Sequence, residues 1–236
     1  MKRFFLSMVV LGLLAIFCIT QNKTAASKNK PNTGFKTNSE KVGYGVGLNI
    51  GRDLKRRQLL VDVNSLAQGI RDALSNAEPK LSQQQIEAAF RAFQEELQAQ
   101  RNLKAVKNKK DGKDFLAKNG KQKGVTTTKS GLQYKILKQG QGKSPKASDT
   151  VKTHYSGTLI DGTEFDSSYK RNTPFTTPVQ DVIKGWTEAL QLMKVGAKWQ
   201  LFIPSDLAYG ENPQDGSPIG PNAALVFDIE LLGIVE

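Results

Sequence analysis

Few side chains between residues 151 and 186 could do chemistry. That stretch holds Asp166, Arg171 and the single histidine of the sequence, His154. Because the chain has one histidine and one cysteine, a metal cluster, a disulfide framework and a cysteine nucleophile are excluded. The same stretch is rich in aromatic and aliphatic residues, so it predicts an apolar pocket and not a nucleophilic centre.

The elements that position these side chains follow from the periodicity of the sequence. Residues 151–159 alternate in a period of two, which indicates a half-buried strand with Tyr155 on one face and His154 on the other. Asp161-Gly162 then predicts a hairpin turn, and the return strand brings Asp166. We therefore expect His154 to be a surface residue and not a general base.

The rest of this half of the chain predicts an α+β fold. Strands are expected at residues 131–137, 198–203 and 225–234, and a short helix at residues 186–193, so an antiparallel sheet should wrap on one helix. The pocket should lie between that helix and the concave face of the sheet. The long Gly- and Pro-rich loop of residues 204–222 is typical of a functional rim.

At this point the sequence resembles a known family. The matching positions, in chain order, are Tyr155, Phe165-Asp166, Arg171, Pro174-Phe175, Val182-Ile183, Gly185-Trp186, Ala208-Tyr209-Gly210, Pro218-Ile219-Gly220-Pro221-Asn222 and residues 225–231. Because these pieces occur in order and at matching spacings across about half of the chain, this region resembles the FKBP-type peptidyl-prolyl isomerases.

The resemblance implies an FKBP-like antiparallel half-barrel sheet wrapped on one short helix, and it implies no cofactor. It also implies catalytic roles for Tyr155, Asp166 and Tyr209, with the Tyr209 hydroxyl and the Ile183 backbone N–H holding substrate carbonyl groups. The substrate-binding residues that it implies are Phe165, Arg171, Phe175, Val182, Ile183, Trp186, Ile219 and Phe227. Proline-containing unfolded or exported polypeptides would be the substrates, and macrolides of the tacrolimus and rapamycin type would be inhibitors.

These residues also have simpler interpretations. Phe227, Val182 and Tyr155 would be core residues in any α+β domain. Asp166 follows an apolar strand, where a carboxylate often serves a turn or an ion pair, here with Arg171.

The N-terminal half of the chain differs sharply in charge and predicts export. Residues 1–124 carry 23 Lys and Arg against 10 Asp and Glu, whereas residues 125–236 carry 11 against 12. Lys2-Arg3 followed by an apolar run to Ile19 indicates a signal peptide within residues 1–26, because the run is shorter than the roughly 20 residues that span a bilayer. A stable anchor and lipidation of Cys18 stay as alternatives; the cleavage site is not fixed by the sequence.

Helix signals mark the segment after the signal. Asp62 predicts an N-cap, Ser82 and Gln85 predict a capping box, and residues 82–119 predict a long Lys-rich helix with Gly112 as its weak point. The short apolar faces of residues 40–97 cannot bury much surface alone, so they predict a homodimer.

The order of these segments is similar to the macrophage infectivity potentiator (Mip) group. The expected organisation is a signal peptide over 1–26, a disordered segment over 27–38, an all-α dimerisation domain over 39–97, a Lys-rich stalk over 98–124 and an isomerase domain over 125–236. We expect a periplasmic, outer-membrane or cell-surface protein that assists folding and does not bind nucleic acid. Two alternatives are a dimeric chaperone or binding module with weak or no isomerase activity, and a basic half that binds an anionic surface.

Overall fold

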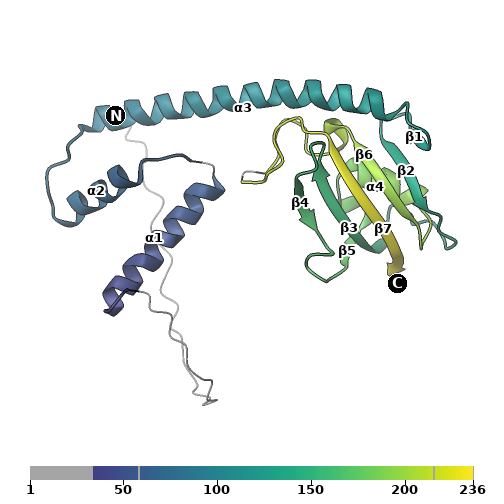
Figure 1. Cartoon of the computed structure of the whole chain (residues 1–236), viewed down its shortest axis with the longest axis horizontal. Helices are drawn as coiled ribbons and strands as arrows, with labels where there is room; N and C mark the ends of the chain where they lie inside the picture. The colour runs from purple at the N-terminus through teal and green to yellow at the C-terminus, as the bar shows by residue number, and fades with distance from the viewer. Residues whose placement is uncertain (1–33, 58, 215, 236) are drawn as a thin grey trace, which may run out of the picture. The chain divides into compact units, whose positions relative to one another are not determined.

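The computed structural model describes residues 34–57, 59–214 and 216–235 (Figure 1). The described chain divides into two compact units, one ending at Val46 and the other beginning at Gly47. The predicted signal peptide of residues 1–26, Cys18 and most of the predicted disordered segment of residues 27–38 lie outside the described residues. Among the residues that are described, no helix is both long and apolar enough to cross a membrane.

The first two helices are exposed or at most half-buried along their whole length. Helix α1 spans Asn38–Arg56 and α2 spans Val63–Leu74, and neither contains a buried residue. The side chain of Asp62 accepts a hydrogen bond from the Ser65 N–H at 2.7 Å, which confirms the predicted N-cap of α2. Their apolar side chains are therefore left without a core in the single chain.

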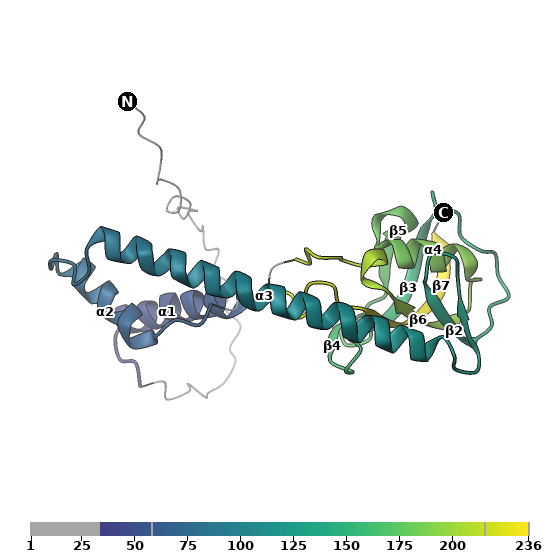
Figure 2. The ribbon, with the colours of Figure 1, turned by 90° about the horizontal axis from the view of Figure 1, so that it is seen from above.

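Helix α3 spans Gln83–Asn119 without a break (Figure 2). The predicted capping box is present, because the Gln85 N–H donates to the Ser82 hydroxyl at 3.3 Å and the Ser82 N–H donates to the Gln85 side chain at 2.9 Å. Exposed i,i+4 ion pairs such as Lys110–Asp114, at 2.9 Å, support the solvated face. Gly112, predicted as the weak point, is one of the buried residues of this helix.

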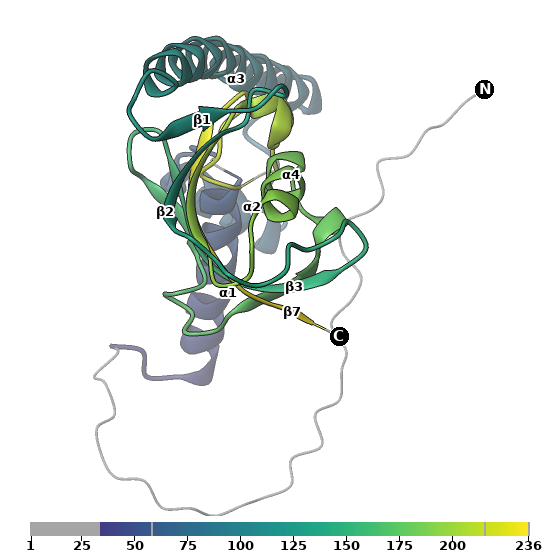
Figure 3. The same ribbon diagram turned by 90° about the vertical axis from the view of Figure 1, so that its right-hand side faces the viewer.

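The C-terminal half forms one curved antiparallel sheet. Its strand order is β1-β2-β6-β7-β3-β4, and β5 pairs with the first half of β3 on the edge that β4 occupies further along. The strands of the described chain are β1 (Val125–Thr127), β2 (Gln133–Lys138), β3 (Thr150–Leu159), β4 (Glu164–Ser167), β5 (Phe175–Pro178), β6 (Lys198–Ile203) and β7 (Leu225–Val235). Figure 3 shows the sheet curving around α4, which spans Lys184–Leu192. The predicted half-barrel wrapped on one short helix is confirmed.

A single buried core lies between α4 and the sheet. It joins Ala189, Leu190 and Trp186 of α4 to Leu201 and Ile229 of the central strands. Gly185 permits this close packing, because a Cβ atom there would lie 2.6 Å from the Cγ2 atom of Ile203. The helix is thereby seated directly on β6, and its first turn reaches the pocket side of the sheet.

Two strands differ from the sequence prediction. Neither β1 nor β5 is among the strands that the sequence predicted. β5 pairs with β3 from Thr153↔Phe175 to Thr150↔Pro178, so backbone hydrogen bonds and not an apolar alternation hold it. Short strands rich in threonine carry little hydrophobic periodicity, which explains why the pattern did not reveal them.

Candidate active site

Three aromatic rings from different elements form the centre of the candidate site. Tyr155 of β3, Trp186 of α4 and Phe227 of β7 are each at most 7% exposed. The ring of Trp186 meets Tyr155 edge-on at 5.1 Å and Phe227 edge-on at 5.3 Å between centroids. Edge-to-face packing of this kind fixes the rings relative to one another. The result is a rigid aromatic floor between the helix and the sheet.

Two further rings and two aliphatic side chains extend this floor. Phe165 meets Phe227 edge-on at 5.5 Å, and Phe175 meets Tyr155 edge-on at 5.7 Å. Val182 and Ile183, which precede α4, are partly buried against the same core. These half-buried side chains give the site an apolar wall that is open to solvent on one side.

Gly157 allows the rings to come this close. It lies on β3 opposite Phe227 of β7 and Asp166 of β4. A Cβ atom at this position would lie 2.6 Å from Phe227 Cε1 and 2.7 Å from Phe165 Cε2, so any larger residue would push the rings apart.

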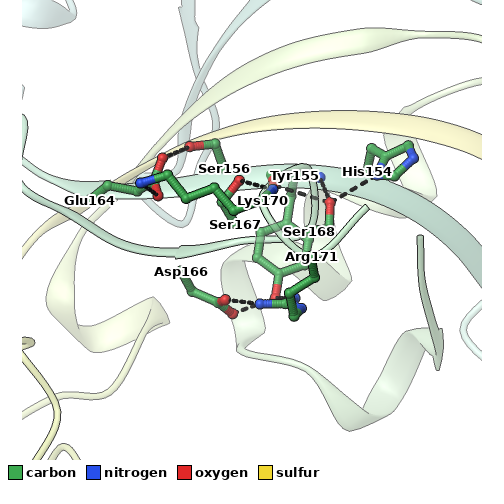
Figure 4. Close-up of polar contacts among 9 residues, drawn as sticks. All are labelled: His154, Tyr155, Ser156, Glu164, Asp166, Ser167, Ser168, Lys170 and Arg171. Atoms are coloured by element: carbon green, nitrogen blue, oxygen red, sulfur yellow. Dashed lines mark hydrogen bonds and ion pairs between the residues drawn. The ribbon is translucent and has the colours of Figure 1, made fainter. Parts of the chain in front are cut away.

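A polar triangle lies at the edge of the aromatic floor (Figure 4). The Tyr155 hydroxyl donates to Asp166 Oδ2 and accepts from Arg171 Nη2 at 2.8 Å. Arg171 also pairs with Asp166 Oδ1 and lies over the Tyr155 ring, with 5.6 Å from Cζ to the centroid. The predicted Asp166–Arg171 ion pair is thus present, and the carboxylate is satisfied on both oxygens.

The electrostatics of the triangle favour fixed protonation states. Burial acts to raise the pKa of Asp166, but hydrogen bonds from Tyr155 and Arg171, together with the Arg171 charge, lower it below its ordinary value. The pKa of Tyr155 is raised, first by burial and then by its hydrogen bond to Asp166. Near neutral pH the site therefore holds a carboxylate and a neutral phenol, and neither is poised to exchange a proton.

Ser168 is a structural part of the site that the sequence did not reveal. It is fully buried, and its hydroxyl accepts from the Tyr155 N–H at 2.8 Å and contacts His154 Nδ1 at 3.0 Å. The Ser168 N–H in turn donates to the Tyr155 carbonyl at 3.0 Å. These bonds fix the backbone of Tyr155. A serine in a turn has many possible partners, so no sequence signal distinguished it.

His154 lies on the predicted face of its strand, but it is half-buried and not the surface residue that the sequence predicted. Its ring stacks on Tyr169 at 4.7 Å and 17°, on the face of β3 opposite to Tyr155. The Tyr169 hydroxyl in turn donates a hydrogen bond to Glu230 Oε2 at 3.3 Å. The histidine is therefore tied into packing behind the site.

The loop between β6 and β7 supplies the remaining candidate residues. Ile219 is 7% exposed and belongs to the same core cluster as Trp186, whereas Tyr209 is 44% exposed. The pKa of the Tyr209 hydroxyl is raised, first by burial and then by the negative charge of Asp166. Ile219 therefore packs with the aromatic floor, whereas Tyr209 lies outside this core cluster, and the role of each predicted residue stays a prediction.

Among residues 34–57, 59–214 and 216–235, no group of three His, Cys, Asp or Glu side chains could hold a metal ion.

Two family models match the chain. One is described as FKBP-type peptidyl-prolyl cis-trans isomerase and matches residues 141–232. The other is described as the domain amino terminal to FKBP-type peptidyl-prolyl isomerase and matches residues 39–136. Together they span both the helical half and the sheet.

Curated relatives and a solved structure are similar over most of their length. The outer membrane protein MIP of Legionella longbeachae is 43% identical over 206 residues, which cover 86% of this chain and 88% of that protein. The peptidyl-prolyl cis-trans isomerase Mip of Coxiella burnetii is 37% identical over 238 residues and 99% of each chain. The crystal structure of FkpA from Escherichia coli is 41% identical, has a TM-score of 0.60, and matches 85% of this chain and 98% of its own.

Proposed function

The chain belongs to the FKBP-type peptidyl-prolyl cis-trans isomerases, and from this premise we propose that its aromatic pocket catalyses the rotation of X-Pro bonds by desolvation. It is an enzyme of that family, and its substrates are proline-containing polypeptides. A role in protein folding is consistent with the same relatives. The way in which the pocket lowers the barrier, and the residues that do so, are our proposal.

The reaction needs no covalent chemistry. Partial double-bond character gives amide rotation a barrier of ~18–20 kcal/mol, and an X-Pro bond interconverts unaided in tens to hundreds of seconds. Twisting the bond removes the resonance and reduces the charge separation of the amide. An apolar, water-poor pocket therefore solvates the twisted amide better, relative to the planar one, than water does.

The aromatic floor of Tyr155, Trp186 and Phe227 is the observation that carries this proposal. Each ring is held edge-on by another, and none of the three is more than 7% exposed. In our proposal Trp186 lies beneath the prolyl ring, and the half-buried Phe165, Phe175, Val182 and Ile183 enclose it. Ile219, from the β6–β7 loop, closes the pocket. The X-Pro amide that rotates then lies in a site with little competing water.

The polar residues would orient the substrate and not exchange protons with it. Asp166 is already bonded to Tyr155 and Arg171, so its charge is offset before substrate enters. In our proposal the Tyr209 hydroxyl and the Ile183 N–H each donate to a substrate carbonyl group. Fixing those carbonyl groups leaves the amide as the bond that is free to turn.

The test of this function is acceleration of cis-to-trans isomerisation in a short X-Pro peptide. The chain beginning at about residue 34 should accelerate the reaction, and Trp186→Leu should remove most of the acceleration while the protein remains folded. An active Trp186→Leu variant would place the pocket elsewhere; an inactive wild type would favour a binding module.

A homodimer through residues 40–97 is the second part of the proposal. Helices α1 and α2 have no buried residue, and Leu66, Ile70 and Leu74 of α2 are 36%, 43% and 81% exposed. A helix face of this kind is stabilised when a second copy covers it. Light scattering should give twice the chain mass, and Ile70→Glu should give the monomer mass with unchanged activity on a short peptide. A monomeric wild type would refute the dimer.

Export and inhibitor binding complete the proposal. We expect the mature protein in the periplasm or at the outer membrane, supported by the apolar run after Lys2-Arg3. Cell fractionation and the mass of the mature N-terminus test this expectation. Macrolides of the tacrolimus or rapamycin type should compete with an X-Pro peptide, because their apolar rings suit the same floor. Inhibition that survives Trp186→Leu would argue against a shared site.

A further inference from the structure

The loop between β6 and β7 packs against the aromatic floor through Ile219. Residues 204–224 connect β6 to β7 and carry Ile219 into the core cluster beside Trp186. At the base of the loop, Asn222 adopts a positive φ of 55° and its N–H donates to the Gly210 carbonyl at 2.8 Å. Within the loop, the Ile219 N–H donates to the Ser217 hydroxyl at 3.2 Å and the Ala223 N–H donates to the Gly220 carbonyl at 3.3 Å. The Pro221 carbonyl, in contrast, accepts a hydrogen bond from outside the loop.

Helix α3 contacts this loop through side chains on successive turns. Asn108 Nδ2 donates to the Pro221 carbonyl at 2.8 Å. Gly220 lies so close to the helix that a Cβ atom there would be 2.6 Å from Lys104 Cε and 2.9 Å from Asn108 Nδ2. One turn further along, a Cβ atom on Gly112 would lie 3.0 Å from the Cβ of Ala224. Gly112 and Gly220 therefore allow helix and loop to touch.

The end of α3 is itself anchored to the sheet. Asn119 and Gln133 are 3% and 6% exposed, and the Asn119 amide donates to the Gln133 side-chain oxygen at 2.8 Å. The Gln133 amide donates to the Leu116 carbonyl at 2.9 Å, and the Phe115 and Phe202 rings lie 6.0 Å apart. Buried and mutually satisfied amides make this junction rigid. The segment of α3 from residue 104 to 119 is thus a fixed platform for the loop.

We propose that Asn108 is a positioning residue of the isomerase, because its hydrogen bond to Pro221 sets where Ile219 stands against the substrate. This inference rests on the isomerase pocket proposed above. Asn108 touches no substrate; it holds the carbonyl two residues beyond Ile219. Loosening that bond changes the width of the pocket on the Ile219 side. The side chain that precedes proline in the substrate is the group most exposed to such a change.

The test compares two substitutions of Asn108, both made in the full chain and both lacking the amide donor. Asn108→Asp replaces the donor by an acceptor that faces the Pro221 carbonyl, and Asn108→Ala removes it. Asn102→Asp is the matched control, because Asn102 is exposed on the same helix and its side chain accepts a hydrogen bond from Gln98 of that helix. kcat and KM are measured on X-Pro peptides with a small, a branched and an aromatic residue before proline.

The expected result is a rise in KM of about two- to tenfold for both Asn108 variants, the range that one lost hydrogen bond corresponds to. The rise should differ between the three peptides, with kcat and the thermal midpoint close to wild type. KM values equal to those of Asn102→Asp on every peptide would overturn the inference. An inactive wild type would instead refute the isomerase function itself, so the two failures are distinguishable.

A second measurement needs no variant. NMR titration of the wild-type chain with an X-Pro peptide should shift the amide resonances of Asn108 and Gly112 together with those of Ile219 and Gly220. The resonances of Asn102 and Val106, on the exposed face of α3, should stay in place. If Ile219 responds to the peptide while Asn108 and Gly112 do not, the helix does not position the loop.

Discussion

The two buried tryptophans of the isomerase domain allow one prediction that separates catalysis from stability. Trp186 and Trp199 are 4% and 5% exposed, and both belong to the same core cluster. Trp186 contacts Tyr155 and Phe227 of the pocket, whereas Trp199 stacks on Tyr134 at 4.3 Å and 13°. Replacing either tryptophan by leucine therefore removes a side chain of the same size from the same core. Only the Trp186 substitution also removes a ring from the proposed floor.

The magnitudes follow from these contacts. A buried Trp→Ala change costs about 3–5 kcal/mol of unfolding free energy, and leucine refills part of the cavity, so each variant should lose about 2–4 kcal/mol. Trp186→Leu also loses two edge-on ring contacts of about 0.5–1.5 kcal/mol each. If those contacts hold the floor in the shape that the twisted amide needs, kcat/KM should fall by about 5- to 150-fold.

The assay is isomerisation of a short X-Pro peptide below the unfolding midpoint of both variants, with urea denaturation to measure stability. Trp199→Leu should keep kcat/KM within about threefold of wild type despite a similar loss of stability. Equal loss of activity in the two variants would refute the reasoning, because the effect would then be general destabilisation of the core. Retained activity in Trp186→Leu would remove the tryptophan from the mechanism.

The other predictions concern the polar triangle, the pH dependence and the close approach of the rings. Tyr155→Phe removes the hydroxyl that bonds to both Asp166 and Arg171, and it should lower kcat/KM by about two- to tenfold. Tyr134→Phe should leave kcat/KM unchanged. A larger loss of kcat/KM in Tyr134→Phe than in Tyr155→Phe would contradict a role for the Tyr155 hydroxyl. Burial opposes ionisation of Asp166, but its partners Tyr155 and Arg171 lower its pKa below the ordinary value. The stability that the carboxylate contributes is therefore fully present above about pH 4, and it is lost as pH falls through the lowered pKa of the folded state. The raised pKa of Tyr155 keeps the phenol protonated below about pH 10, and stability falls as pH rises above that value. kcat/KM should accordingly be flat between about pH 5 and 9, and a bell-shaped profile in that interval would indicate a general acid or base. Gly157→Ala places a Cβ 2.6 Å from the Phe227 ring, so it should lower the free energy of unfolding by about 1–3 kcal/mol and reduce activity. Gly162→Ala, on the exposed turn, should lower stability because of its φ of 87° but leave the pocket intact. Loss of activity in Gly162→Ala alone would contradict the role of Gly157.

Much of the fold was accessible from the sequence because local signals and long-range pairing agree. The alternation through Tyr155, the capping box at Ser82 and the apolar last strand each specify an element by a strong pattern. The strands that were missed, β1 and β5, are short and held mainly by backbone pairing. A pattern of side chains cannot show an element that side chains do not specify.

The candidate site divides in the same way. The family signature identified Tyr155, Asp166 and Trp186, and the structure brings their side chains to one place. Ser168 could not be identified, because its role depends on a turn that folds it behind Tyr155. The contact of Asn108 with Pro221 joins residues 113 positions apart, and only the folded chain brings them together. Gly112 illustrates the difference: the sequence suggested a weak point in a helix, whereas the structure shows a contact surface for Ala224.

Catalysis by desolvation is tested by the wild-type kcat/KM for a short X-Pro peptide, measured in H2O and in D2O. Desolvation of a twisting amide moves no proton in the rate-limiting step, so the account predicts clear acceleration over buffer and the same kcat/KM in both solvents. A rate that is clearly slower in D2O would show a proton in flight and would contradict the account.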